Sequence, residues 1–491
     1  MKLDALLSHL ETIHVTGSKD RDITALAYDS RRVKPGTLFI ALKGEKVDGT
    51  QFIEAAVAAG AEAVISESSE FKTRATNITV ANARSAMADA AAAFFQHPAR
   101  ALKTAGVTGT NGKTTTAFLI KHICESAMLR SGLIGTVRYE VGDRVLPAAR
   151  TTPESLDLHE LLWQMRSAGC KAAVMEVSSH ALMQERVRGV EFDAAVFTNL
   201  TQDHLDYHKT MEAYFEAKSL LFSNLAKQSR KKGKAVINLD DRYGQRLVQR
   251  FSKELPITTY GVGVHADFRA SNVRIDFHGT SYQLDAGGRS YLVRLPLIGQ
   301  FNVYNSLAAL AAAHAMGVDV RQGVLALSTA AAVPGRLEAV PAQRQFRVFV
   351  DYAHTDDALL NVIRTCRELN PARLIVVFGC GGNRDKTKRP RMGAVVDQHA
   401  DYAIVTSDNP RKESPEAIIE DIKPGLKRGR YEVIVDRKEA IFKAIAMAQA
   451  RDIVLIAGKG HETYQEFADH TAPFDDAAVA KEALDAKRID T

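Results

Sequence analysis

The sequence contains few cysteines, a single tryptophan and no long hydrophobic run. Its four cysteines lie far apart and form no C-x-x-C pair, which argues against a disulfide framework or a structural zinc site and for reduced thiols. No apolar stretch reaches the roughly 18 residues that a membrane span requires. The alanine-rich stretch 307–316 predicts a short buried helix instead. We therefore expect a cytoplasmic protein without a membrane span.

The amino terminus and the charge argue against two further classes of protein. Residues 1–15 carry acidic side chains and lack the basic start and the continuous apolar core of a signal peptide. The formal net charge of +6 is small for 491 residues, and no basic run with interleaved aromatic residues indicates a nucleic-acid partner. The basic segment 230–234 is typical of a solvated loop.

Short apolar stretches alternate with helical patterns, which is typical of parallel sheets covered by helices on both faces. Strands are expected at residues 37–42, 61–66, 78–83, 104–109, 172–179, 194–199, 234–241, 346–354, 374–382, 402–411, 431–436 and 452–462. Residues 267–296 alternate in polarity and predict antiparallel strands. The chain is too long for a single hydrophobic core. Breaks in the pattern near residues 96–102 and 331–338 predict an α/β fold of three domains.

The stretch GTNGKTTT at residues 109–116 follows an expected strand and precedes a helical pattern, which is the context of a phosphate-binding P-loop. In such a loop the backbone N–H groups and the helix N-terminus bind phosphates. Lys113 would contact the β- and γ-phosphates, and Thr114 would bind Mg²⁺. The spacing departs from the common motif, because five residues instead of four separate Gly106 from Gly112. A glycine-rich turn without nucleotide is the alternative.

Polar residues follow two of the expected strands, where ligands bind in open α/β sheets. The segments are MEVSSH at 175–180 and TNLTQDHLDYH at 198–208. Together with the P-loop they predict a Mg²⁺ site in which Glu176 and His204 join Thr114. Taken alone, each segment is equally compatible with a capped helix start.

Two helical segments add polar candidates. EAKSLLF at 216–222 places Lys218 on a helix, and GQFNVYNSLAA at 299–309 offers Asn302 and Asn305, whose amides suit the edge of an adenine ring. Helix capping is the alternative role of the two asparagines.

These motifs, with PGRLE at 334–338 and DYAHT at 351–355, resemble in order and spacing the Mur ligases of peptidoglycan synthesis, whose relatives include folylpolyglutamate synthetase and cyanophycin synthetase. The resemblance covers almost the whole chain. The segments at 28–44, SDNPR at 407–411 and GKGHE at 458–462 are similar to the branch that adds the third residue of the stem peptide. One departure is Asp356, where the family usually has proline, and we expect a local loop change with intact chemistry.

The resemblance implies an ATP-dependent amide ligase that requires Mg²⁺. The D-Glu γ-carboxylate of UDP-MurNAc-L-Ala-D-Glu would attack the γ-phosphate of ATP, and an amine would then attack the resulting acyl phosphate. Lys113 and Mg²⁺ would neutralise the negative charge that accumulates. The partners would be small molecules, namely UDP-MurNAc-L-Ala-D-Glu, meso-diaminopimelate and ATP, and the protein would be a monomer.

The resemblance also assigns the domains and the sites. Residues 1–98 would form a smaller α/β domain for the UDP end, 99–334 a central P-loop ATPase domain with a mainly parallel sheet, and 335–491 a Rossmann-like domain for the amino acid. ATP would contact Gly109, Thr110, Asn111, Gly112, Lys113, Thr114, Thr115, Asn302, Asn305, Arg336 and Asp351. The UDP-MurNAc-dipeptide would contact Tyr28, Ser30, Glu45, Lys46, Val47, Thr151, Thr152, Ser178, Gln184 and Arg186. Diaminopimelate would contact Arg384, Asp408, Asn409, Pro410, Arg411, Gly458 and Glu462. The catalytic residues would be Lys113, Lys218 and His204, and the metal ligands Thr114, Glu176, His204 and carbamylated Lys218.

Lys218 is an unusual neighbour for a metal, because two cations repel each other. In the family the matching lysine is carbamylated, which turns it into an anion that can bind Mg²⁺. The alternative is a free lysine that pairs with Glu216 or with solvent.

The segment SDNPR predicts the acceptor. Pro410 restricts the turn that holds Arg411, and a planar guanidinium can bind the distal carboxylate of diaminopimelate with two hydrogen bonds. Lysine lacks that carboxylate and would leave a buried arginine unpaired, at a cost of about 2–5 kcal/mol. The alternative role of Arg411 is a solvated arginine in a strand-to-helix turn. The alternative functions are the same ligase adding L-lysine, a folylpolyglutamate-synthetase-like ligase or another Mur ligase, and a P-loop switch that hydrolyses nucleotide without an amine.

Overall fold

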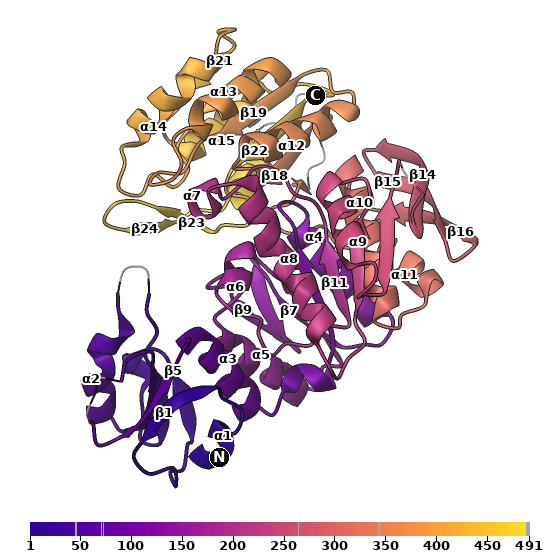
Figure 1. The fold of residues 1–491 in the computed structure, drawn as a ribbon. Coiled ribbons are helices and arrows are strands. Elements are labelled where there is room, and N and C mark those ends of the chain that lie inside the picture. Colours follow the sequence, from indigo (N-terminus) through magenta and orange to yellow (C-terminus); the bar gives the residue numbers. More distant parts are fainter. Residues whose placement is uncertain (45–46, 70, 72, 264, 342–343, 488–491) are drawn as a thin grey trace.

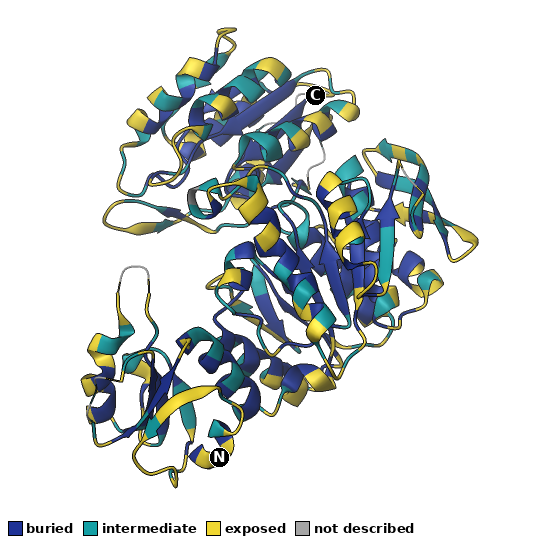
Figure 2. Ribbon diagram, viewed as in Figure 1, coloured by how far each residue is buried: buried dark blue, intermediate teal, exposed yellow. Residues whose placement is uncertain are grey.

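The structure is a computed structural model that describes residues 1–44, 47–69, 71, 73–263, 265–341 and 344–487. The chain forms three α/β parts, each built on its own sheet (Figure 1). The amino-terminal part, in indigo, and the carboxyl-terminal part, in orange and yellow, both flank the central part. The inner strands of the sheets are mostly buried, whereas edge strands such as residues 12–16 are largely exposed (Figure 2). The predicted α/β fold of three domains is confirmed, whereas the exact domain limits stay a prediction.

The amino-terminal sheet has the strand order β1-β5-β4-β3-β2 and is parallel except between β1 and β5. Its strands are β1 (Thr12–Thr16), β2 (Ala25–Ala27), β3 (Thr37–Ile40), β4 (Ala61–Ser66) and β5 (Thr76–Val80), and its helices are α1 (Leu3–Leu7), α2 (Ile53–Ala58) and α3 (Ala83–Phe94). Every residue of β3 is buried, because apolar side chains cover both faces of the sheet.

The central sheet has the order β16-β15-β14-β13-β12-β11-β6-β10-β7-β8-β9 and is parallel from β14 to β7. Its strands are β6 (Lys103–Thr108), β7 (Ser131–Ile134), β8 (Arg138–Val141), β9 (Arg144–Pro147), β10 (Ala172–Glu176), β11 (Ala194–Phe197), β12 (Lys234–Asn238), β13 (Ile257–Gly261), β14 (Phe268–Asp276), β15 (Gly279–Ala286) and β16 (Arg289–Leu295). Its helices are α4 (Lys113–Ser126), α5 (Ser155–Ser167), α6 (Ser179–Met183), α7 (Leu205–His208), α8 (Met211–Lys227), α9 (Arg242–Phe251), α10 (Gln300–Ala315) and α11 (Val320–Leu327). The antiparallel strands expected within 267–296 are confirmed as β14 to β16.

The carboxyl-terminal sheet has the order β17-β18-β22-β19-β20-β21, in which only β17 is antiparallel to its neighbour. Its strands are β17 (Glu338–Ala339), β18 (Arg347–Asp351), β19 (Leu374–Phe378), β20 (Tyr402–Val405), β21 (Tyr431–Val433) and β22 (Ile453–Ala457). A separate hairpin joins β23 (Tyr464–Glu466) to β24 (Thr471–Pro473). The helices are α12 (Asp356–Glu368), α13 (Lys388–His399), α14 (Pro415–Ile422), α15 (Arg437–Met447) and α16 (Asp476–Ala486).

Among the described residues, no helix is both long enough and apolar enough to cross a bilayer. The alanine-rich stretch 307–316 belongs to the buried helix α10, as predicted. Several strands end earlier than predicted: β20, for example, stops at Val405, whereas the sequence predicted a strand over 402–411. The polar residues after these strands turn into loops, and the loops at adjacent strand ends form the candidate sites.

One buried ion pair fixes the last helix to the carboxyl-terminal sheet. The guanidinium of Arg437 on α15 donates to the carboxylate of Asp476 on α16, with Nε–Oδ1 and Nη2–Oδ2 distances of 2.7 Å, and both side chains are 0% exposed. Arg437 also donates to the backbone carbonyls of Ser407 at 3.3 Å and Ala457 at 3.1 Å. The pair therefore holds the ends of β20 and β22 at a fixed separation.

Removing the carboxylate by Asp476→Ala is expected to lower the free energy of unfolding by about 3–5 kcal/mol, because Arg437 would remain as an uncompensated buried charge. Urea unfolding followed by circular dichroism measures the loss. The control is Glu482→Ala, which breaks the pair between the same two helices that Lys438 and Glu482 form at 2.8 Å with side chains 49% and 55% exposed. That change should cost no more than about 1 kcal/mol. Equal losses in the two variants would contradict the role of the buried pair.

Candidate active site

A cavity of about 660 Å³ lies between the central and carboxyl-terminal parts. The P-loop and the residues after β10 and β11 line one side, and Arg336 with parts of segment 351–368 lines the other. Of the predicted site residues, those that line this cavity are Thr110, Asn111, Gly112, Lys113, Thr114, Thr115, Thr151, Glu176, Ser178, His204, Lys218, Asn305, Arg336 and Asp351. The carboxyl ends of adjacent parallel strands thus meet at one cavity, as the sequence predicted.

The P-loop follows β6, and two of its backbone carbonyls bind the side chain of Lys113. The Nζ atom of Lys113 donates to the carbonyl oxygens of Gly109 at 3.0 Å and Thr110 at 2.8 Å, and burial lowers the pKa of this lysine. Gly112 has a φ of 84°, and a Cβ atom there would collide with Asn305 on α10. The unusual spacing is explained by Gly106, which lies inside β6, where a Cβ atom would lie 2.7 Å from the Phe192 ring.

Oxygen atoms gather beside the P-loop. The hydroxyl of Thr114 donates to the Glu176 carboxylate at 3.0 Å, and this carboxylate also accepts from the backbone N–H of Thr136 at 2.8 Å and from its hydroxyl at 3.1 Å. Carboxylate and hydroxyl oxygens are hard ligands that suit Mg²⁺. The residues present therefore fit the metal that the family resemblance implies.

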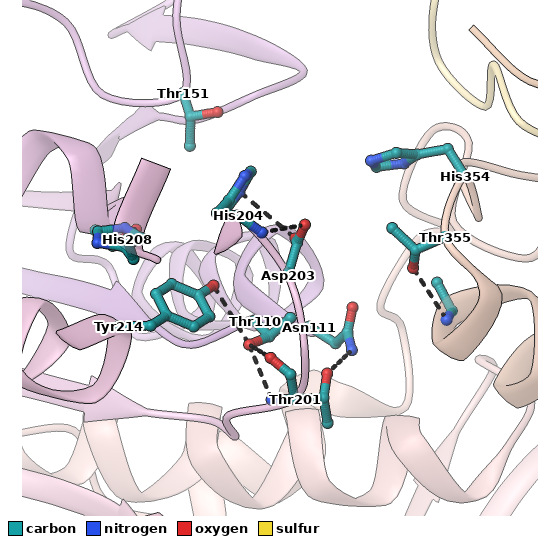
Figure 3. A network of polar contacts seen from close by, with 12 residues as sticks. Thr110, Asn111, Thr151, Thr201, Asp203, His204, His208, Tyr214, His354 and Thr355 are labelled. Carbon is teal, nitrogen blue, oxygen red and sulfur yellow. Dashed lines mark hydrogen bonds and ion pairs between the residues drawn. The ribbon is translucent and has the colours of Figure 1, made fainter. Parts of the chain in front are cut away.

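His204 lines the same cavity on a non-glycine left-handed backbone with a φ of 54°, and its Nε2 lies 3.5 Å from Asp203 (Figure 3). Among the residues that the structure describes, no group of three or more His, Cys, Asp or Glu side chains is close enough to hold a metal ion. The predicted ligand set contains only Glu176 and His204 of these types. This set stays a prediction.

Lys218 on α8 is 2% exposed, and its Nζ donates to the carbonyl oxygen of Gly109 at 2.7 Å. Nζ also lies 4.6 Å from the centre of the Tyr214 ring. Burial, and next the charge of Lys113, lower the pKa of Lys218 well below its usual value. Glu216 instead pairs with Arg250 at 2.8 Å. Lys218 therefore pairs with neither Glu216 nor solvent, and its carbamylation stays a prediction.

Two contacts join the parts across the cavity. Arg336 donates to the hydroxyl of Thr114 at 3.2 Å. Asp357 accepts from the Asn111 amide at 3.1 Å and from the Thr201 hydroxyl at 3.0 Å. Figure 3 shows Asn111 and Thr201 together beside the loop that carries Asp203. Sequence reasoning missed Asp357, because nothing in the sequence relates it to a residue 246 positions away.

Asp356, which replaces the usual proline, is the first residue of α12. The Thr355 hydroxyl caps this helix by accepting from the backbone N–H of Ala358 at 3.2 Å. The first helical position accepts proline, and an acidic side chain there favours the helix dipole. The Asp356 carboxylate lies 3.3 Å from Arg391 Nε on α13. The substitution therefore fits the local backbone without strain.

The two asparagines of α10 have different surroundings. Asn302 donates to the carbonyl of Ile298 at 2.9 Å and accepts from the Asn305 amide at 2.9 Å, and it does not line the cavity. The expected contact between Asn302 and adenine therefore lacks support, whereas Asn305 lines the cavity beside the P-loop. Asp351 accepts from the backbone N–H groups of Leu337 and Ala353, so that it shapes the loop that carries Arg336.

The residues predicted to bind the dipeptide surround a buried glutamate. Arg186 donates to the carbonyl of Thr152 at 2.9 Å and lies 3.0 Å from Glu154, which also pairs with Arg84 and Arg150. Gln184 accepts from Arg186 at 2.7 Å. Thr152, Gln184 and Arg186 do not line the cavity, whereas Thr151 and Ser178 do.

The residues predicted to bind the UDP end lie in the amino-terminal part. The Tyr28 hydroxyl donates to Asp157 on α5 at 2.5 Å, and burial, followed by this contact, raises the pKa of Tyr28. Ser30 begins a short 3₁₀ turn, and Val47 is exposed. Glu45 and Lys46 lie outside the described residues.

The predicted amino-acid residues cluster where β19, β20 and β22 end, beyond the cavity. The Asn409 amide donates to Glu462 at 2.8 Å, and its oxygen accepts from Lys459 Nζ at 2.8 Å. Lys459 is fully buried and lies 3.3 Å from Glu462. A Cβ atom on Gly458, whose φ is 121°, would lie 2.5 Å from the Asp408 carboxylate. Sequence reasoning missed Lys459, although it lies within the GKGHE motif.

Arg411 has a left-handed backbone with a φ of 54°, directly after Pro410. Its Nε donates to Glu466 on β23 at 2.7 Å, and its Nη1 donates to the carbonyl of Gly382 at 2.9 Å. The exposed side chain of Arg384 belongs to the neighbouring loop. The expectation that lysine would leave Arg411 unpaired is therefore wrong, because Glu466 already compensates its charge.

The amino-acid cluster is connected to the metal-binding oxygens. His461, which follows Gly458 in the same loop, lies near the backbone of Thr136, and burial lowers the pKa of His461 to about 4. Thr136 in turn donates to Glu176. Both predicted binding regions therefore contact one short loop after β7.

Three family models match successive parts of the chain. They are described as "Mur ligase family, catalytic domain" for residues 22–105, "Mur ligase middle domain" for 107–313, and "Mur ligase, glutamate ligase domain" for 335–460.

The chain is also similar to curated proteins over its full length. A protein of Syntrophomonas wolfei named UDP-N-acetylmuramoyl-L-alanyl-D-glutamate--2,6-diaminopimelate ligase is 44% identical over 491 residues, which cover 99% of this chain and 100% of the relative. A protein of the same name from Geobacillus kaustophilus is 48% identical over 488 residues, which cover 99% of each chain.

Solved structures have the same fold. A structure of a ligase with the same name matches with a TM-score of 0.71 at 38% identity and covers 94% of this chain and 95% of that chain. A MurF ligase from Thermotoga maritima in complex with ADP shares the fold alone, with a TM-score of 0.64, 19% identity, and coverage of 95% of this chain and 97% of that chain. On these similarities, the chain belongs to the Mur ligase family.

Proposed function

We propose that this protein is an ATP-dependent ligase that joins the amine of meso-diaminopimelate to the D-Glu γ-carboxylate of UDP-MurNAc-L-Ala-D-Glu, through an acyl phosphate. The observation that carries the proposal is one cavity that is lined by the P-loop, Glu176 and Lys218 from the central part and by Arg336 and Asp351 from the opposite side. The names of the full-length relatives support the same reaction. The reaction would take place in the cytoplasm on small molecules, and the enzyme would act as a monomer.

The first step needs positive charge, because a carboxylate must approach the triphosphate of ATP. Lys113 at the start of α4 and the N–H groups of the P-loop would bind the phosphates. Arg336 lies on the opposite side of the cavity, 3.2 Å from Thr114, and would stabilise the charge that develops on the transferred group. Bound Mg²⁺, held by Thr114, Glu176, His204 and carbamylated Lys218, would supply further neutralisation of the phosphate oxygens.

The second step needs an amine near the acyl phosphate and no competing water. Glu462 would pair with an ammonium of the acceptor, and Arg411 and Arg384 would bind its distal carboxylate. Asp357 and Arg336 hold the carboxyl-terminal part against the P-loop, which limits the access of water to the intermediate. Arg186, Thr151 and Ser178 would orient the dipeptide so that its γ-carboxylate reaches the cavity.

Lys113→Ala is expected to reduce phosphate release at least about a hundredfold, because the main positive charge at the γ-phosphate is lost. The fold should persist, since Lys113 bonds only to carbonyls of its own loop. A coupled phosphate assay measures the loss, with the exposed Lys438→Ala as the control. Unchanged turnover in Lys113→Ala would remove the P-loop from the mechanism.

Lys218→Ala is expected to lose most of the activity, and acetate or formate should restore part of it by replacing the carbamate oxygens. The low pKa of Lys218 favours the neutral amine that reacts with CO₂. Carbon-13 NMR after incubation with labelled bicarbonate should show a carbamate signal in the wild type and not in Lys218→Ala. The exposed Lys227→Ala on the same helix is the control. Absence of both the signal and the rescue would count against carbamylation.

Wild-type enzyme with UDP-MurNAc-dipeptide and ATP should use diaminopimelate at least about tenfold better than lysine or ornithine. A tenfold preference corresponds to a net gain of about 1.4 kcal/mol from the distal carboxylate, after the bond that Arg411 already makes with Glu466 is subtracted. Arg411→Ala should raise the KM for diaminopimelate and leave the KM for ATP nearly unchanged. Equal use of lysine would favour the L-lysine-adding alternative, and nucleotide hydrolysis that no amine stimulates would favour the P-loop switch.

A further inference from the structure

We propose, resting on the function proposed above, that Glu466 is an internal competitor for the acceptor site. In the free enzyme its carboxylate occupies the guanidinium of Arg411, and the distal carboxylate of the acceptor replaces it on binding. Glu466 lies at the end of β23, outside the motifs that led to the predicted site.

The donors of Arg411 show why an exchange is needed. A carboxylate binds a guanidinium with two hydrogen bonds along one of two edges, either Nε with one Nη atom or both Nη atoms together. Glu466 occupies Nε at 2.7 Å, and the Gly382 carbonyl occupies Nη1 at 2.9 Å. Nε has a single N–H, so Glu466 occupies this donor fully, whereas Nη1 has a second N–H. A second carboxylate can bind along the Nε edge with two hydrogen bonds only when Glu466 leaves it.

The partner that can leave is the Glu466 side chain. The Gly382 carbonyl belongs to a backbone with little freedom, because the Gly382 N–H donates to Asn409 at 2.9 Å and a Cβ atom on Gly382 would collide with the Pro410 carbonyl. The Glu466 side chain is 42% exposed, whereas that of Arg411 is 20% exposed. Rotation of the Glu466 carboxylate into water would free the Nε edge.

The backbone of Glu466 stays in place during such an exchange. Its N–H donates to the Asn409 side chain at 3.0 Å, and its carbonyl accepts from the Arg411 N–H at 3.0 Å. The hairpin of β23 and β24 therefore remains attached to the turn that carries Arg411. Only one side chain has to move for the guanidinium to change its partner.

The exchange affects acceptors differently. An acceptor with a distal carboxylate replaces one anion at Arg411 by another, so that the guanidinium stays compensated and the net gain is the difference between the two bonds. An acceptor that ends in an ammonium leaves the Arg411–Glu466 pair intact and gains no bond from Arg411. The Arg411–Glu466 pair therefore lowers the affinity that the dicarboxylic acceptor gains from its contact with Arg411.

Glu466→Gln tests the exchange, because the amide keeps the size of the side chain and removes its charge. The KM for diaminopimelate should fall about two- to fivefold, as expected for the loss of a partly exposed ion pair. The KM for lysine should not fall. The matched control is Asp469→Asn in the turn of the same hairpin, where Asp469 is 86% exposed and pairs with His470. This control should change neither KM.

A second comparison shows whether the effect acts through the ion pair. In an Arg411→Ala background, Glu466→Gln should no longer change the KM for diaminopimelate, and a persistent change would overturn the proposal. An unchanged or higher KM in the single Glu466→Gln variant would overturn the exchange alone, since the wild type would still use diaminopimelate. A wild type without diaminopimelate-dependent phosphate release would overturn the proposed function and the exchange together.

Discussion

Two lysine side chains meet at one backbone oxygen, and the candidate active site depends on this contact. The carbonyl of Gly109 accepts from Lys113 at 3.0 Å and from Lys218 at 2.7 Å. Two ammonium groups at one acceptor repel each other, and burial increases the cost of both charges. The arrangement becomes favourable when an anion such as a phosphate enters, or when Lys218 loses its proton. The geometry of the loop therefore favours two changes, the binding of a nucleotide phosphate and the loss of the proton from Lys218.

The sequence predicted those features that local patterns determine. The limits of β4 were predicted correctly, because a buried apolar run there follows the Gly60 turn, and the strand–loop–helix context identified the P-loop. The short strands β7, β8 and β9 were not predicted. Strands such as 402–411 were predicted too long, because the sequence does not show at which residue the backbone leaves the sheet and enters the loop.

Side-chain partners could not be predicted where they depend on distant contacts. Glu466 lies 55 residues from Arg411, and the pairing compensates a charge that the sequence analysis expected to remain unpaired without the distal carboxylate. Similarly, Glu216 is two residues from Lys218, yet the helix directs it to Arg250 on α9, while Lys218 faces the P-loop. In both cases the sequence identified the important residue and not its partner, because the partner is determined by how the elements pack.

The buried contact between Arg437 and Asp476 has a consequence for synthesis of the chain. Arg437 reaches the ends of β20 and β22, but its counter-charge lies on α16, after every strand of that sheet. During translation, Arg437 therefore lacks this partner until α16 has left the ribosome. The amino-terminal and central sheets have no such dependence on α16 for their strands, and domains generally fold in order of synthesis. The acceptor half of the enzyme would thus mature last, after the nucleotide half has already folded.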